Sequence, residues 1–259
     1  MKERILEELK KIEETENVKI IMAVESGSRA WGFASPDSDY DVRFIYVRKF
    51  EDYLKLEKVR DVIEWKLDEV LDINGWDIKK TLQLLHNSNP TVFEWCASPI
   101  VYKETEEFTW LKEILPMYFS EKKSLYHYWH TADSTYRDHL MGEKVKIKKY
   151  FYVLRPLLAA KWILDKKTAP PMLFEKLVAA ELEEEIRPEL NYLLELKKTL
   201  SEIWLGNKNP VIDAYIERML PEMKAIADAI EDHASDWETL FTPQSEGYQI
   251  FRAKNSLFL

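Results

Sequence analysis

The sequence predicts an α+β protein, with an N-terminal mixed sheet carrying helices and a C-terminal domain built entirely from helices. Residues 20–24 form a short apolar run, and residues 39–47 form a second extended stretch, as expected for strands. Beyond residue 107 the apolar residues recur at the three-to-four-residue spacing of helices. The character changes at 103–107, so we expect two domains, 1–105 and 106–259.

The composition is that of a globular protein with a sizeable core, because 46% of the residues are hydrophobic and 13% aromatic. No apolar run reaches the roughly 20 residues that cross a bilayer, and the N-terminus is charged, unlike a signal peptide. Cys96 is the only cysteine, which excludes an intrachain disulfide. We therefore expect a cytoplasmic protein with no membrane partner.

The net charge of −9 excludes nucleic-acid binding driven by bulk charge alone. Any polynucleotide partner would need a local basic patch. A nucleotide site remains compatible with this charge, because bound metal ions supply positive charge at such sites.

The N-terminal elements follow from their patterns. Residues 1–16 predict an amphipathic helix that covers the sheet, with Ile5, Leu9 and Ile12 on its apolar side. After the strands at 20–24 and 39–47, the stretches 62–67 and 70–74 predict two strands that pair antiparallel across a turn. Further elements are expected as helices at 78–86 and 91–96 and an edge strand at 100–102.

The second half predicts a helical bundle without internal repeats or low-complexity tracts. Its expected helices are 109–119, 120–140, 145–164, 171–180, 185–203 and 210–232. Gly142 and the stretches 165–170 and 206–210 separate them.

A Gly-Ser turn follows the first strand and has the features of a phosphate site. Gly27 lets the backbone pass close to a ligand, and Ser28 can open a helix whose free N–H groups favour phosphate oxygens. Arg29 is a candidate phosphate contact, with a surface ion pair as its alternative. The chain has six glycines, and Gly27 and Gly32 both fall within this short stretch.

The second strand carries two carboxylates on one face. Asp39 and Asp41 are two residues apart, about 7 Å at a rise of about 3.3 Å per residue, and point the same way. Carboxylates this close repel each other unless a cation lies between them. Mg²⁺ is the expected cation because it accepts carboxylates together with substrate phosphates, and two ions would clamp a phosphoryl displacement.

Two other motifs are excluded. The glycine spacing from Gly27 to Gly32 matches a Walker A loop, but Phe33 follows and the required lysine is missing. The aspartate series around Asp39 starts like an EF-hand loop, but Val42 stands where glycine is needed and Arg48 where a glutamate is needed.

A basic stretch opens the long helix expected at 145–164. Lys148, Tyr152 and Arg155 are spaced i, i+4, i+7 and share one face. They could neutralise a triphosphate or hold a polynucleotide backbone. The alternative is a solvated basic stretch that offsets an acidic bundle. Arg155 stands among apolar neighbours, which predicts a specific partner.

The order Gly27-Ser28, a short gap, then Asp39-x-Asp41 resembles the signature of the DNA polymerase β-like nucleotidyltransferase superfamily. Within it, the chain is similar to bacterial predicted nucleotidyltransferases associated with RNA-repair pathways, on residues 71–85, 89–102 and 148–163 as well. The resemblance implies a nucleotidyltransferase-fold catalytic domain followed by a helical domain. It also implies transfer of a nucleoside monophosphate from a triphosphate, with ATP expected, to an acceptor such as an RNA end.

The resemblance further implies a third carboxylate on a strand just before a helix, where Asp72 lies. Asp77, which suits a helix N-terminus, and Glu64, on the partner strand, are the alternatives. Asp39, Asp41 and Asp72 would then hold two Mg²⁺ ions, with Mn²⁺ as a substitute. Asp72 would help to activate the acceptor hydroxyl, while Gly27 and Ser28 bind the triphosphate.

Two other functions stay open at this point. A related transferase could modify a protein or a small hydroxyl compound, as antitoxin-type and aminoglycoside-type relatives do. A catalytically inactive nucleotide-binding scaffold would predict a broken acid set, whereas Asp39 and Asp41 are both present. The base preference, the number of nucleotides added and the oligomeric state do not follow from the sequence.

Overall fold

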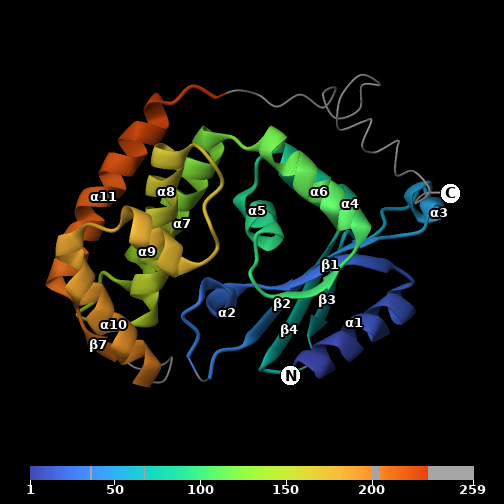
Figure 1. Ribbon diagram of the computed structural model, residues 1–259, viewed down its shortest axis with the longest axis horizontal. Helices are drawn as coiled ribbons and strands as arrows, with labels where there is room; N and C mark the ends of the chain where they lie inside the picture. The colour runs from blue at the N-terminus through green and yellow to red at the C-terminus, as the bar shows by residue number, and fades with distance from the viewer. Residues whose placement is uncertain (36, 67, 200–204, 233–259) are drawn as a thin grey trace. The chain divides into compact units, whose positions relative to one another are not determined.

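The computed structural model describes residues 1–35, 37–66, 68–199 and 205–232, which fall into two compact units (Figure 1). The described part of the first unit comprises Met1–Gly27 and Asp39–Tyr118. The described part of the second comprises Ser28–Ser38 and residues 119–232. A short segment of the N-terminal half, which the expected division at 105/106 places in the first domain, thus belongs to the helical unit.

The first unit is built on a five-stranded mixed sheet with the strand order β3-β4-β2-β1-β5. Its strands are β1 (Lys19–Glu25), β2 (Tyr40–Val47), β3 (Val62–Lys66), β4 (Leu71–Asp77) and β5 (Val101–Glu104). Strands β2 and β4 are parallel, and the other neighbours, including the predicted β3–β4 pair, are antiparallel. The predicted α+β class is confirmed.

One face of this sheet is covered by α1 (Lys2–Glu16). Ile5, Leu9 and Ile12 of the helix are buried in one cluster with the sheet residues Ile20, Ala23, Val42, Phe44, Tyr46, Ile63, Leu71 and Ile73. Each such buried side chain contributes roughly 1.5–3 kcal/mol. Because side chains alternate along a strand, the residues between these on β2 and β4 point to the opposite face.

The opposite face is covered by the helices that follow β4 and β5 (Figure 1). These are α4 (Ile78–His86), α5 (Pro90–Cys96) and α6 (Glu106–Ile114). Trp76 of β4 stacks on Trp95 of α5 with ring centroids 3.8 Å apart. A short helix α3 (Phe50–Tyr53) and a 3-10 turn (Leu115–Tyr118) complete the unit.

The second unit packs its helices around a large apolar core. They are α7 (Glu121–His139), α8 (Lys148–Lys166), α9 (Phe174–Glu181), a 3-10 turn (Glu184–Ile186), α10 (Arg187–Thr199) and α11 (Pro210–Ala229). Phe33, which follows α2 (Gly27–Trp31), enters this core against the rings of Phe151 and Phe174. None of the helices in the described part of the chain is long and apolar enough to span a membrane.

One element of this unit differs from the prediction. Residues expected at the start of a helix instead form β6 (Lys144–Lys146), which pairs antiparallel with β7 (Leu205–Asn207). The helix α8 begins only at Lys148. A three-residue strand is too short to show a period-2 pattern, and its partner lies about sixty residues away, so neither strand has a local signature.

Candidate active site

The acids predicted on two different strands lie side by side. In the parallel pairing of β2 with β4, Asp41 stands directly opposite Asp72, and both side chains point to the face opposite α1. The guanidinium of Arg43 joins them. Its Nη2 donates to Asp41 Oδ1 and to Asp72 Oδ2, each at 2.9 Å. One cation is therefore shared by two carboxylates.

Arg43 is held in this position by further bonds. Its Nη1 donates to the backbone oxygens of Val42 at 3.0 Å and Asp72 at 3.2 Å. The sequence analysis gave Arg43 no role. Strand alternation was a usable signal, because Arg43 follows Asp41 by two residues and so shares its face.

Negative charge is concentrated around Asp41 at this end of β2. Burial raises the pKa of Asp41, Arg43 opposes the rise, and the negative charges of Asp72 and Asp39 add to it. Asp39 is exposed and lies just before β2. Asp39 and Asp72 thus both lie close enough to Asp41 to influence its carboxyl group.

Carboxylate oxygens are the kind of ligand that Mg²⁺ prefers. As the side chains stand, no group of three or more Asp, Glu, His or Cys residues among those described is arranged to hold a metal ion. Asp41 and Asp72 instead face the guanidinium of Arg43. Carboxylates of this kind are the ligands that a divalent cation needs. In the structure, Arg43 is the positively charged partner of two of them, Asp41 and Asp72.

Gly27 touches this acid pair directly. Its φ is 59°, and a Cβ atom built on it would lie 2.2 Å from Asp41 Oδ2. No other residue type fits there without moving the carboxylate. The backbone N–H of Ser26 also donates to the backbone oxygen of Asp41 at 2.8 Å. The turn at Gly27 and the strand β2, which are close in the sequence, are therefore also in contact in the structure.

Glu25 is a residue of the site that the sequence analysis missed. It is fully buried at the end of β1, where its Oε1 accepts from the backbone N–H of Asp41 at 2.8 Å. Its Oε2 accepts from the hydroxyl of Tyr102, and its backbone oxygen accepts from Ser98 Oγ at 2.6 Å. A buried carboxylate is costly unless it is bonded. A glutamate ending an apolar strand was the available signal, and its bonds fix the start of β2.

The two alternatives for the third carboxylate do not stand opposite Asp41 in the strand register. Asp77 is buried and caps α4, with Oδ1 accepting from the Lys79 N–H at 2.8 Å and Oδ2 from the Tyr53 hydroxyl at 2.9 Å. It sits at the opposite end of β4 from Asp72 and on the other face. Glu64 is exposed on β3, opposite Asn74. Neither bonds to Asp41.

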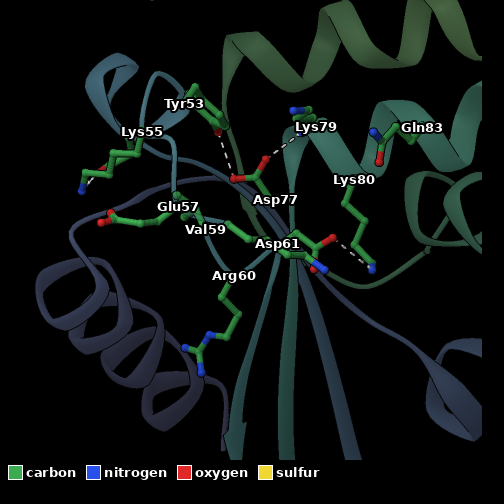
Figure 2. A pocket seen from close by; sticks show the side chains of 12 residues that line it. Tyr53, Lys55, Glu57, Val59, Arg60, Asp61, Asp77, Lys79, Lys80 and Gln83 are labelled. Atoms are coloured by element: carbon green, nitrogen blue, oxygen red, sulfur yellow. Dashed lines mark hydrogen bonds and ion pairs between the residues drawn. The ribbon is translucent and has the colours of Figure 1, made fainter.

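Asp77 instead lines a separate pocket of about 390 Å³ (Figure 2). Figure 2 shows the cap bond to Lys79, the Tyr53 bond and an ion pair between Lys80 and Asp61. Side chains of both charges line it, among them Lys55, Glu57, Lys58 and Arg60. None of the acids Asp39, Asp41 and Asp72 lines this pocket.

The other predicted nucleotide-binding residues belong to the second unit. Arg29 donates from Nη2 to the backbone oxygen of Ser38 at 2.6 Å, which closes the loop that starts at Ser28. Tyr152 packs edge-on against the ring of Trp31, with centroids 5.3 Å apart. The guanidinium carbon of Arg155 lies 4.6 Å from the centroid of the same ring.

Arg155 is almost completely buried, and its Nη2 also approaches the backbone oxygen of Met172 at 3.5 Å. The structure therefore brings Tyr152 and Arg155 together on Trp31. Lys148 opens α8, close to Lys146 and Lys149. The pKa of Lys149 is lowered by burial and then by the charges of Lys148 and Lys146. Cations crowded at the positive end of a helix favour an anionic ligand.

The family model described as "RlaP: RNA repair pathway DNA polymerase beta family" matches residues 1–242. The chain belongs to this family. Membership confirms the resemblance on which the sequence analysis relied, at the level of a polymerase β-like, nucleotidyltransferase-related family associated with RNA repair.

Relatives of this RNA-repair family member are also found. The uncharacterized protein YcgL of Bacillus subtilis (strain 168) is 47% identical over 243 residues, which is 91% of this chain and 92% of YcgL. A nucleotidyltransferase-like protein of known structure from Exiguobacterium sibiricum 255-15 aligns with 97% of this chain and 81% of its own. At 14% identity and a TM-score of 0.30, that alignment supports no argument about this chain.

Proposed function

We propose that this protein is a nucleotidyltransferase that moves a nucleoside monophosphate from a nucleoside triphosphate, ATP by preference, to an acceptor hydroxyl. The acceptor that we propose is an RNA end. The observation that carries the proposal is the pairing of Asp41 with Asp72 on adjacent strands, in contact with Gly27. Membership of an RNA-repair polymerase β family supports the RNA acceptor.

We assign Asp39, Asp41 and Asp72 as the ligands of two Mg²⁺ ions, with Mn²⁺ able to replace them. Bound divalent cations would offset the charge of the triphosphate and favour the deprotonated acceptor hydroxyl. Glu25 holds the backbone of Asp41, Gly27 leaves room for its carboxylate, and Arg43 bonds that carboxylate, so the group is positioned before any ligand arrives. Such preorganisation lowers the cost of reaching the transition state.

Asp72 is the member of the pair with the more open side chain, 48% exposed compared with 33% for Asp41. It is therefore the better placed to accept the proton of an incoming hydroxyl. In the reaction, the acceptor oxygen forms a bond to the α-phosphorus, and the bond from that phosphorus to the bridging oxygen breaks. Pyrophosphate leaves, and the proton passes from the hydroxyl to Asp72.

The backbone at Gly27 and the hydroxyl of Ser28 are the proposed triphosphate contacts, joined by Arg29. Lys148, Tyr152 and Arg155 of the second unit are also proposed as nucleotide-binding or RNA-binding residues. Tyr152 and Arg155 also hold Trp31, so their removal would disturb packing as well as binding. Lys148 is the clearer test of this part of the proposal.

The test is transfer of label from each α-³²P ribonucleoside triphosphate, with Mg²⁺, to RNA or to cell protein. Wild type should label RNA, and Asp41→Asn should reduce the rate by at least about 100-fold. Asp165→Asn is the matched control, because it makes the same change at an exposed surface pair with Lys166. If the label appeared on protein and not on RNA, the acceptor would be a protein. Transfer by Asp41→Asn at the wild-type rate would exclude the acid pair as the catalytic centre.

A further inference from the structure

The guanidinium of Arg43 lies where a cation shared by Asp41 and Asp72 would lie. We propose that Arg43 competes with the divalent cation for these carboxylates, so that metal binds tightly only together with the nucleotide. This inference rests on the proposed function, since it concerns the same acid pair.

The geometry supports competition rather than a simple surface ion pair. A single nitrogen, Arg43 Nη2, reaches both carboxylates at 2.9 Å. The Arg43 side chain is 18% exposed, less than either acid, and two backbone oxygens also hold its Nη1. Charge-assisted bonds of this kind are about twice as strong as neutral ones. A metal ion that takes the same oxygens must first break them.

The charge balance explains why the nucleotide should matter. One guanidinium offsets one of the two carboxylate charges of the pair. A divalent cation added alone would lie within a few ångströms of this guanidinium, and the like charges would repel. A triphosphate brings the negative charge that makes the arrangement of Arg43, metal and acids favourable. Metal and nucleotide are therefore coupled, and each raises the affinity for the other by the same factor.

The experiment measures Mn²⁺ binding without nucleotide, from the electron paramagnetic resonance signal of the free ion. Arg43→Met removes the guanidinium and keeps an apolar chain of similar length. It should bind Mn²⁺ about tenfold more tightly than wild type, as expected for the loss of a charge-assisted competitor. Arg4→Met is the matched control in the same unit, because Arg4 pairs with Asp68 at an exposed position, and it should bind like wild type.

A double variant tests whether the increase in Mn²⁺ affinity depends on Asp41. Arg43→Met combined with Asp41→Asn should lose this increase, and retention of the increase would overturn the inference. Equal or weaker Mn²⁺ binding by Arg43→Met would overturn it too. If that variant fails to fold by circular dichroism, Arg43→Gln is used instead. Its amide carries no charge and so cannot replace the guanidinium as a cationic competitor. It should still tighten Mn²⁺ binding several-fold, and unchanged affinity would overturn the competition.

The binding measurement also separates this inference from the proposed function. Tighter Mn²⁺ binding by Arg43→Met that depends on Asp41 would support the competition, even if no acceptor is ever labelled. Label transfer that depends on Asp41, with no effect of Arg43→Met on Mn²⁺ affinity, would retain the proposed function and overturn the competition.

Discussion

Replacing Gly27 with alanine should damage the candidate site more than any comparable small change. At φ 59° an alanine costs about 1–2 kcal/mol in backbone strain. The new methyl would stand 2.2 Å from Asp41 Oδ2, and an ordinary contact needs 3.4 Å, so the two must separate by about 1.2 Å. The carboxylate therefore has to turn away or the strand start has to shift.

A displacement of about 1 Å in a catalytic group can cost about 100-fold in rate. We therefore expect Gly27→Ala to lose 1–3 kcal/mol of unfolding free energy, by the order of magnitude of local strain, and about 100-fold in label transfer. Urea unfolding followed by circular dichroism gives the first quantity. The α-³²P transfer assay gives the second.

Gly142→Ala is the control for this prediction. A Cβ at Gly142 would meet its nearest neighbour at 3.6 Å, an ordinary contact. This variant should unfold and react like wild type. If Gly27→Ala behaves like Gly142→Ala in both assays, the contact between the Gly-Ser turn and Asp41 has no role in the activity, and the reasoning fails.

Three further predictions follow from hydrogen bonds of carboxylates in the first unit. Tyr102→Phe removes the hydroxyl that donates to the buried Glu25, and should cost about 1–3 kcal/mol in urea unfolding. Asp77→Ala should cost about 0.5–2 kcal/mol through loss of the α4 cap, with label transfer kept within about twofold of wild type. Burial acts to raise the pKa of Glu107, but hydrogen bonds, first that from Lys19, lower it to about 2 from an ordinary 4.5. Since the folded state lowers this pKa, the bond stabilises the protein above pH 4.5, and that stability is lost as the pH falls towards 2. Glu107→Gln should thus be roughly 1–2 kcal/mol less stable at pH 7, allowing for the half-exposed lysine, with the gap closing in that window.

Each of these has a result that contradicts it. Wild-type stability in Tyr102→Phe would mean that the buried carboxylate does not need this donor. A loss of transfer in Asp77→Ala as large as that in Asp41→Asn would make Asp77 the third carboxylate. A stability gap in Glu107→Gln that stays constant from pH 7 to 2 would show that the effect is packing and not charge.

Features encoded locally could be predicted from the sequence. The alternation around Asp41 and the antiparallel pair of β3 and β4 need only near neighbours in the chain, and both are present. The contact between Arg43 and Asp72 could not be predicted, because it depends on the parallel register of β2 with β4. The same holds for the strands β6 and β7, which are too short to carry a pattern of their own.

The position of the Ser28–Ser38 segment was also beyond local patterns. The sequence predicted the turn at Gly27, but it gave no indication of where the residues after the turn would pack. Trp31 and Phe33 are apolar side chains in a polar loop, and they pack against Tyr152 and Phe151, more than a hundred residues later in the chain. Contacts between residues so far apart in the chain leave no pattern in the local sequence, so only the three-dimensional structure shows them.

The parallel pairing of β2 with β4, called the seam below, joins two antiparallel strand pairs, β1–β2 and β3–β4. The β1–β2 pair carries Gly27 at its end and Asp41, and the β3–β4 pair carries Asp72. Each pair can form from nearby chain, whereas the seam requires a longer loop closure and so forms later. Any ligand that bridges Asp41 and Asp72 therefore fastens two separately formed pieces of sheet. Its binding should slow amide exchange along β2 and β4 before it affects the rest of the unit.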